Sequence, residues 1–217
     1  MKWLVGFHRI LCHRRKYVEL TIRILTIAPV FVAVMNNCVD SQRVNDDVQA
    51  IQERFAQANI KIPWDGTIHH FTLPSNIPTD WIMRYRESGT WRLTDDAKAI
   101  LDEANPSRYP FCLVYVPAPL YATNNVPNNE IAGSAVAKYG FTNSVDAVYL
   151  GNMFISSDST ISVYVPAHEL CHILGVSNHV FEPWNLMYGN RLPNKKGVTG
   201  PKRLTSEQIK TMRESLP

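Results

Sequence analysis

The sequence predicts an α+β domain with a small mixed β-sheet, and three observations carry that prediction. Apolar residues from Val44 to Ala58 fall at helical spacing, so residues 42–58 should form an amphipathic helix. The run FCLVYV at 111–116 lies between two prolines and is typical of a buried strand. A second helix, which carries regularly spaced histidines, follows the predicted strands. Helix, strands and then helix is an order that favours an α+β architecture.

The remaining elements follow from turn and capping signals. Thr94 can cap a helix that ends at Asn105-Pro106, and Asp95 and Asp96 are favourable in its first turn. Thr205 and Gln208 have the form of a capping box, which predicts a last helix from about Ser206. The other expected strands, from their apolar runs and flanking turn residues, are 60–63, 67–73, 131–138 and 147–150.

The first 38 residues differ from the rest of the chain. A basic stretch is followed by the apolar run ILTIAPVFVAVM at 24–35 and then by Asn36-Asn37-Cys38, which is the order of a secretory signal. We therefore expect residues 1–38 to be a leader, as a signal peptide or a membrane or lipid anchor. Residues 39–217 are then one catalytic domain of an exported protein. An ordinary N-terminal helix is the alternative.

Charge separates the same two parts. Residues 1–38 hold six Lys or Arg and one Glu, which leaves 16 basic and 18 acidic side chains in the remainder. The basic pI therefore belongs to the predicted leader, and no nucleic-acid partner is expected for the domain. Within the domain Cys112 and Cys171 could form a disulfide or remain two buried thiols, since the sequence gives no distance between them.

The residues that point to chemistry lie in HELCHILGVSNH, at 168–179. His168 and His172 are one helical turn apart, so both imidazoles can bind one metal ion, and Glu169 lies beside the first. Gly175 can adopt the left-handed conformation that ends a helix and turns the chain back. His179 then becomes available as a third ligand, which leaves the fourth position of a catalytic zinc ion for water.

This segment resembles the metzincin clan of zinc peptidases, whose motif HExxHxxGxxH is followed by a tight turn with a methionine beneath the metal. Met187, in NLMY, matches that Met-turn, and the predicted last helix is similar to the clan's C-terminal helix. The clan's third ligand would fall on Asn178, one residue early. We favour His179, because imidazole is a far better zinc ligand than a neutral amide.

The resemblance implies a monomeric zinc endopeptidase that acts on proteins or peptides. Its Zn²⁺ would be held by the three histidines, and Glu169 would be the general base toward a metal-activated water. Gly175 and Met187 would shape the site without binding the metal. Val148 and Tyr149 would line the cleft as an edge strand that pairs with an extended substrate.

Other interpretations remain open from the sequence. In a gluzincin-like peptidase the third ligand would be a later glutamate, for which Glu207 and Glu214 are the candidates. The domain could also bind zinc without turnover, as a silent binding module, or the motif could be fortuitous in a membrane-associated protein without metal. His69 and His70 are discounted, because adjacent strand residues face opposite sides of a sheet.

Overall fold

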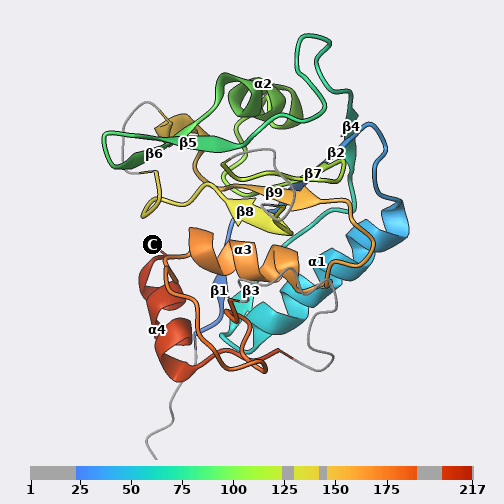
Figure 1. Ribbon diagram of the computed structural model, residues 1–217. Helices are drawn as coiled ribbons and strands as arrows, with labels where there is room; N and C mark the ends of the chain where they lie inside the picture. Colours follow the sequence, from blue (N-terminus) through green and yellow to red (C-terminus); the bar gives the residue numbers. More distant parts are fainter. Residues whose placement is uncertain (1–22, 124–129, 142–145, 190–201, 217) are drawn as a thin grey trace, which may run out of the picture.

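A computed structural model describes residues 23–123, 130–141, 146–189 and 202–216. Its centre is a five-stranded mixed sheet in the order β4-β2-β7-β9-β8, in which only the β8–β9 pair is antiparallel. Helices cover both faces of this sheet (Figure 1). The strands of the sheet are β2 (Phe31–Met35), β4 (His69–Phe71), β7 (Cys112–Val116), β8 (Gly133–Ala135) and β9 (Asn152–Ser156).

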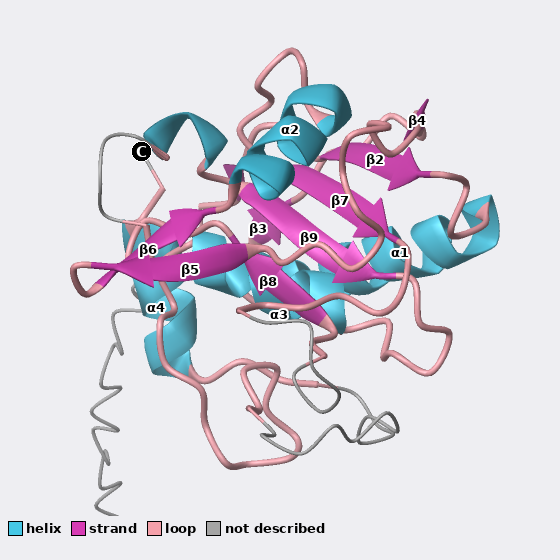
Figure 2. Ribbon diagram, turned by 45° about the horizontal axis from the view of Figure 1, so that its top comes forward, coloured by secondary structure: helices cyan, strands magenta, loops and turns pink. Residues whose placement is uncertain are grey.

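Three helices lie below the sheet in the view of Figure 1, and one lies above it. Below are α1 (Ser41–Ala56), α3 (Val165–Ile173) and α4 (Ser206–Glu214). Above are α2 (Asp95–Ala104) and a two-stranded hairpin of β5 (Arg84–Glu87) and β6 (Thr90–Leu93), which Figure 2 shows in front of the sheet. A small parallel pair, β1 (Leu25–Thr26) and β3 (Ile60–Lys61), extends the lower layer.

The two central strands are buried on both faces. In β2, Val32 and Val34 belong to the core shared with α1 and α3, whereas Ala33 and Met35 belong to the core shared with α2. Such a strand has a continuous apolar sequence, because each face of the sheet meets its own hydrophobic layer. Hydrophobic burial on both sides is therefore what fixes the sheet between its helices.

This strand corrects the interpretation of residues 24–38. The apolar run expected to be the core of a leader instead forms β1 and β2, and its residues Val32 to Val34 are fully buried. A buried parallel strand and the apolar part of a signal are alike in sequence, which explains the error. The basic residues of the predicted leader lie mostly in 1–22, outside the described residues, so export and anchoring stay predictions. No helix in the described part of the chain is long and apolar enough to cross a membrane.

The second correction concerns residues 147–150, which were expected to be a strand. Ala147–Tyr149 is a short 3₁₀ helix, and the strand begins later, at Asn152. Gly151 separates the two with φ of 91°, and a side chain there would meet the carbonyl oxygen of Pro110. Only glycine tolerates both conditions, so the strand cannot start before residue 151.

The other elements agree with the sequence within a few residues. Thr94 and Thr205 cap their helices as predicted, and the full capping box with Gln208 is present. The hairpin of β5 and β6 was not predicted, although Ser88-Gly89, both at positive φ, is a hairpin signal between two strands. Cys112 and Cys171 are free thiols in the cores on opposite faces of the sheet, so they do not form a disulfide with each other.

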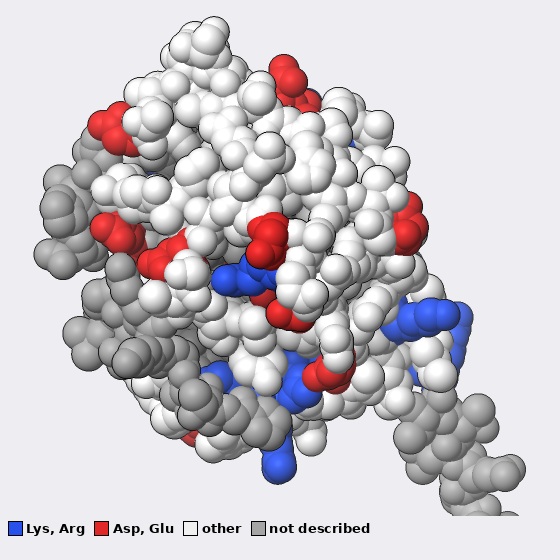
Figure 3. Space-filling view, turned by 90° about the vertical axis from the view of Figure 1, so that its right-hand side faces the viewer, with Lys and Arg blue, Asp and Glu red and all other residues white. Residues whose placement is uncertain are grey.

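Acidic and basic side chains are interspersed over the face seen in Figure 3.

Candidate metal centre

The helix that carries the site, α3, is short and mostly buried. Pro166 lies in its first turn, where proline is tolerated because the missing N–H would have no partner inside the helix. Ala167, Leu170 and Cys171 are fully buried in the lower core. Their packing against α1 and the sheet presents His168 and His172 on the remaining face of the helix.

The helix ends in the way the sequence predicts. Gly175 has φ of 90°, and the bonds Val176 N–H to Cys171 O (3.0 Å) and Gly175 N–H to His172 O (3.1 Å) close a Schellman-type cap. A side chain at Gly175 would also approach α4, whose Thr211 and Ser215 lie 3.7 Å away. The cap turns the chain sharply, so that residue 179 returns toward the helix.

The three histidines meet at their Nε2 atoms. Nε2 of His179 lies 3.0 Å from Nε2 of His168 and 3.1 Å from Nε2 of His172, and the three ring atoms form the one candidate metal cluster among the described residues. A tetrahedral zinc ion with bonds of about 2.0–2.1 Å would place its nitrogen ligands roughly 3.3 Å apart. The observed separations match that arrangement closely.

The tautomers of two rings are fixed by backbone carbonyls. His168 Nδ1 donates to Leu186 O at 2.8 Å, and His172 Nδ1 donates to Val176 O at 2.7 Å. Each bond leaves the lone pair on Nε2, where a metal ion would bind, and such carbonyl partners are typical of metal-binding histidines.

Electrostatics keeps these rings neutral. Burial, the largest effect, acts together with the neighbouring histidines to lower the pKa of His168 to about 3 and that of His172 to about 4. Burial also lowers the pKa of His179. Neutral imidazoles whose lone pairs face one another repel, and a divalent cation between them removes the repulsion. The donor set therefore fits zinc, and the exposed side of His179 leaves an approach for solvent.

Glu169 lies beside the histidines and is almost fully buried. The backbone N–H of Ala135, on the edge strand β8, donates to its carboxylate, and the charge of Arg84 favours its ionised form. Burial, the largest effect, raises the pKa of Glu169 to about 8. Close packing makes this contact possible, because a side chain at Gly133 would lie 3.1 Å from Glu169 Cγ and 2.8 Å from Val165 Cγ1.

A tight turn at residues 185–188 supports the histidines from below. Tyr188 N–H bonds to Asn185 O at 3.2 Å, Met187 is fully buried, and Leu186 supplies the carbonyl that holds His168. Asn185 and Gln208 exchange two amide hydrogen bonds of 3.1 Å, which fasten the turn to the first turn of α4. Met187 is thus a buried residue of this turn, and its role as the floor of a metal site stays a prediction.

Other sequence candidates lie elsewhere. Val148 and Tyr149 are in the 3₁₀ helix, with the Tyr149 hydroxyl donating to Asp102, so they cannot act as an edge strand for a substrate. The antiparallel edge strand beside α3 is β8, which the sequence had placed within 131–138.

The alternative ligands also lie apart from the cluster. Glu207 is exposed in the first turn of α4, and Glu214 pairs with Lys210 at 3.7 Å. Asn178 is exposed, whereas His179 belongs to the candidate cluster with His168 and His172. His69 is engaged with the carbonyl of Glu103, at 3.2 Å.

Sequence reasoning missed three contributors to this site. Arg84 and Tyr139 border the histidines from loops and strands far along the chain, and no local pattern marks them. Gly189 is required by His179, because a side chain there would lie 2.5 Å from His179 Cβ. The sequence does show a glycine shortly after NLMY, which was the available signal. The contact that requires this glycine exists only in the folded chain.

The fold is similar to known structures, although the sequence is not. No family model and no curated protein matches the sequence. The crystal structure of archaemetzincin from Methanopyrus kandleri has a TM-score of 0.55 and 14% identity over 87% of this chain and 94% of that protein. Metalloproteinase-II from Bacteroides fragilis has a TM-score of 0.54 and 14% identity over 89% of this chain and 54% of that one, so this chain spans about half its length. At such identity the likeness shows the fold alone.

Proposed function

We propose that this chain is a zinc-dependent endopeptidase of the metzincin type. One observation carries the proposal. Nε2 of His179 lies within hydrogen-bonding distance of Nε2 of both His168 and His172, and the residue after the first histidine is a buried carboxyl that accepts the N–H of Ala135. The similarity in fold to archaemetzincin and to metalloproteinase-II supports it. In this proposal the turn at 185–188 is the Met-turn, with Met187 as the floor of the site.

The roles follow from the positions. His168, His172 and His179 would hold the ion, which when bound supplies an activated water and polarises the scissile carbonyl. Glu169 would accept the water's proton and return it to the leaving amine. The edge of β8 that pairs with no other described strand would hold an extended peptide by strand pairing, in place of Val148 and Tyr149. A protein or peptide substrate, a monomeric state and export remain parts of this proposal.

Metal analysis tests the ligand set. Wild-type protein should bind equimolar zinc, His179→Ala should lose most of it, and Asn178→Ala, which alters the neighbouring residue, should keep it. The reason is that two histidines and solvent make a far weaker zinc site than three histidines. Loss of zinc from Asn178→Ala together with its retention by His179→Ala would assign the third ligand to Asn178 and refute the proposed set.

Hydrolysis tests the base. Glu169→Gln keeps the size of the side chain and cannot accept the proton, so it should bind zinc and cleave no peptide in a broad library that the wild type cleaves. Full activity in Glu169→Gln would remove the mechanism. Zinc binding by the wild type with no cleavage at all would favour a silent zinc-binding domain.

A further inference from the structure

One arginine outside the metal ligands has a side chain that makes no hydrogen bond or ion pair with another described residue. Arg84 begins β5, and its backbone N–H bonds to Ala122 O at 2.9 Å. The bridges Ile82–Tyr121 and Tyr121–Glu130 connect this segment to the chain just before β8. Figures 1 and 2 agree that the β5–β6 hairpin lies beside β8. The backbone of Arg84 is therefore connected, through residues 121 and 122, to the chain that leads into β8.

The guanidinium of Arg84 packs on an aromatic ring, but its hydrogen-bonding groups have no partner among the described residues. It stacks on Trp91 with its Cζ 4.5 Å from the ring centroid, and its Nε is buried with no hydrogen-bond partner among the described residues. No ion pair joins it to a carboxylate in that part of the chain. Burial lowers the pKa of Arg84, although arginine stays charged. Arg84 is only partly buried, and its side chain makes no hydrogen bond with another described residue, so this geometry suits a ligand that supplies oxygen atoms.

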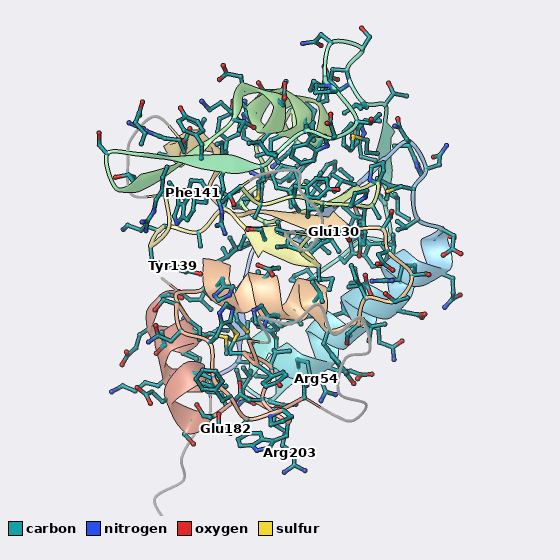
Figure 4. The ribbon with its side chains drawn as sticks, viewed as in Figure 1. Arg54, Glu130, Tyr139, Phe141, Glu182 and Arg203 are labelled. Atoms are coloured by element: carbon teal, nitrogen blue, oxygen red, sulfur yellow. The ribbon has the colours of Figure 1, made fainter. Side chains whose placement is uncertain are left out.

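The positive charge of Arg84 acts on residues of the proposed active site. The charge of Arg84 lowers the pKa of both Glu169 and His172, and it also interacts with Tyr139. The Tyr139 ring meets the edge of His172, with ring centroids 5.7 Å apart, and this side chain is 47% exposed. Figure 4 shows Tyr139 beside α3 and below the hairpin. Tyr139, which is exposed, thus contacts His172, and the charge of Arg84 acts on both residues.

We propose that Arg84 is the anion-binding residue of the substrate site, and that it binds a carboxylate of the peptide next to the scissile bond. A planar guanidinium fixed by an aromatic ring matches a carboxylate with two parallel hydrogen bonds. The carboxylate would come from an acidic side chain or from the peptide's C-terminus. This inference rests on the proposed peptidase function and adds the class of substrate to it.

The chain offers a matched control in Arg86. It is on the same strand and packs on Trp91, with its Cζ 5.1 Å from the centroid, but it is exposed and has no effect on the pKa of Glu169 or His172. Arg84→Gln and Arg86→Gln therefore remove the same charge from the same hairpin. Only Arg84→Gln removes the positive charge from the proposed carboxylate-binding subsite.

The experiment compares peptide pairs that differ in one carboxylate. One pair has Glu or Gln beside the cleaved bond, and the other has a C-terminal acid or amide. Wild-type protein should prefer the acidic member of one pair by roughly 10- to 100-fold in kcat/KM, the value of a charge-assisted hydrogen bond. Arg84→Gln should abolish that preference, and Arg86→Gln should keep it. The pair that shows the effect identifies the source of the carboxylate.

Binding gives a readout that does not need turnover. Zinc-loaded Glu169→Gln should bind the preferred acidic peptide more tightly than its neutral partner, and Glu169→Gln/Arg84→Gln should not. If wild type cleaves peptides but Arg84→Gln lowers both members of each pair equally, Arg84 is only a counter-charge for Glu169, and the inference is overturned while the function stands. If no peptide is cleaved, the function fails, and the binding ratio still decides about Arg84. Should Arg84→Gln not fold, Arg84→Lys keeps the stacking stem and should show a reduced preference in the same two assays.

Discussion

The contact between Asn185 and Gln208 should stabilise the domain by a measurable coupling energy. Both side chains are buried, and they exchange two hydrogen bonds of 3.1 Å between the turn at 185–188 and the first turn of α4. A buried neutral hydrogen bond contributes about 0.5–1.5 kcal/mol net, so the pair should be coupled by about 1–3 kcal/mol. A cycle of Asn185→Ala, Gln208→Ala and the double variant measures this value.

The single variant Asn185→Ala should cost more than the coupling. Its Oδ1 also accepts the N–H of Met187 at 2.7 Å, and the change takes the partner from that N–H and from the Nε2 group of Gln208. Each unsatisfied buried group costs about 1–3 kcal/mol, so with two such groups the free energy of unfolding should fall by about 2–6 kcal/mol. That loss corresponds to a decrease in Tm on the order of 10 °C for a domain of this size.

Urea denaturation of the metal-free protein is the assay, because metal binding would add its own stabilisation. Lys210→Ala is the control on the same helix, since Lys210 is exposed and its pair with Glu214 is a surface contact of 3.7 Å. The reasoning is refuted if the coupling energy between Asn185 and Gln208 is below about 0.5 kcal/mol, the error with which independent sites add.

Two further predictions concern other buried groups. Gly133→Ala should destabilise the domain by about 1–3 kcal/mol and lower hydrolysis, because its Cβ would lie 2.8–3.2 Å from three atoms, one of them in Glu169. Gly140→Ala, whose nearest atom is 3.7 Å away, should change little, and equal effects of both in thermal melts and activity would contradict the packing argument. Asp47 is buried against Tyr115, and burial raises its pKa to about 6 from 3.8. The folded state therefore binds the proton more tightly, and its stability should fall as pH rises from about 4 to 6, by up to about 3 kcal/mol. In Asp47→Asn the free energy of unfolding, measured by urea titration, should not show this decrease across that pH range. An unchanged decrease would assign the pH dependence to another group.

The parts of the site that the sequence revealed are those made by neighbouring residues. His168, His172 and Gly175 lie within two helical turns, so helical spacing and a single left-handed residue determine their relation. Helix caps at Thr94 and Thr205 were predictable for the same reason, since each bond spans three residues. His179 followed from ligand chemistry, and the cap at Gly175 brings it to the cluster.

The parts that the sequence did not reveal depend on contacts between distant segments. The run 31–35 was assigned to a leader, because burial on both faces removes the alternation that marks a strand. Arg84 reaches the site from a hairpin far before the motif, and Gly133 is needed only because Glu169 packs on it. No pattern within a short window contains that information.

Two backbone carbonyls orient the first two histidines, one through a local contact and the other through a contact between distant segments. His172 is held by Val176, four residues later, so the helix cap orients it as soon as α3 forms. His168 is held by Leu186, in the turn that Asn185 and Gln208 fasten to α4. The zinc affinity of Asn185→Ala should therefore fall by roughly 10- to 100-fold, the usual effect of losing the partner of a ligand. The ring of His168 should become mobile by NMR while the ring of His172 stays ordered. Equal mobility of both rings would show that the turn does not act through His168.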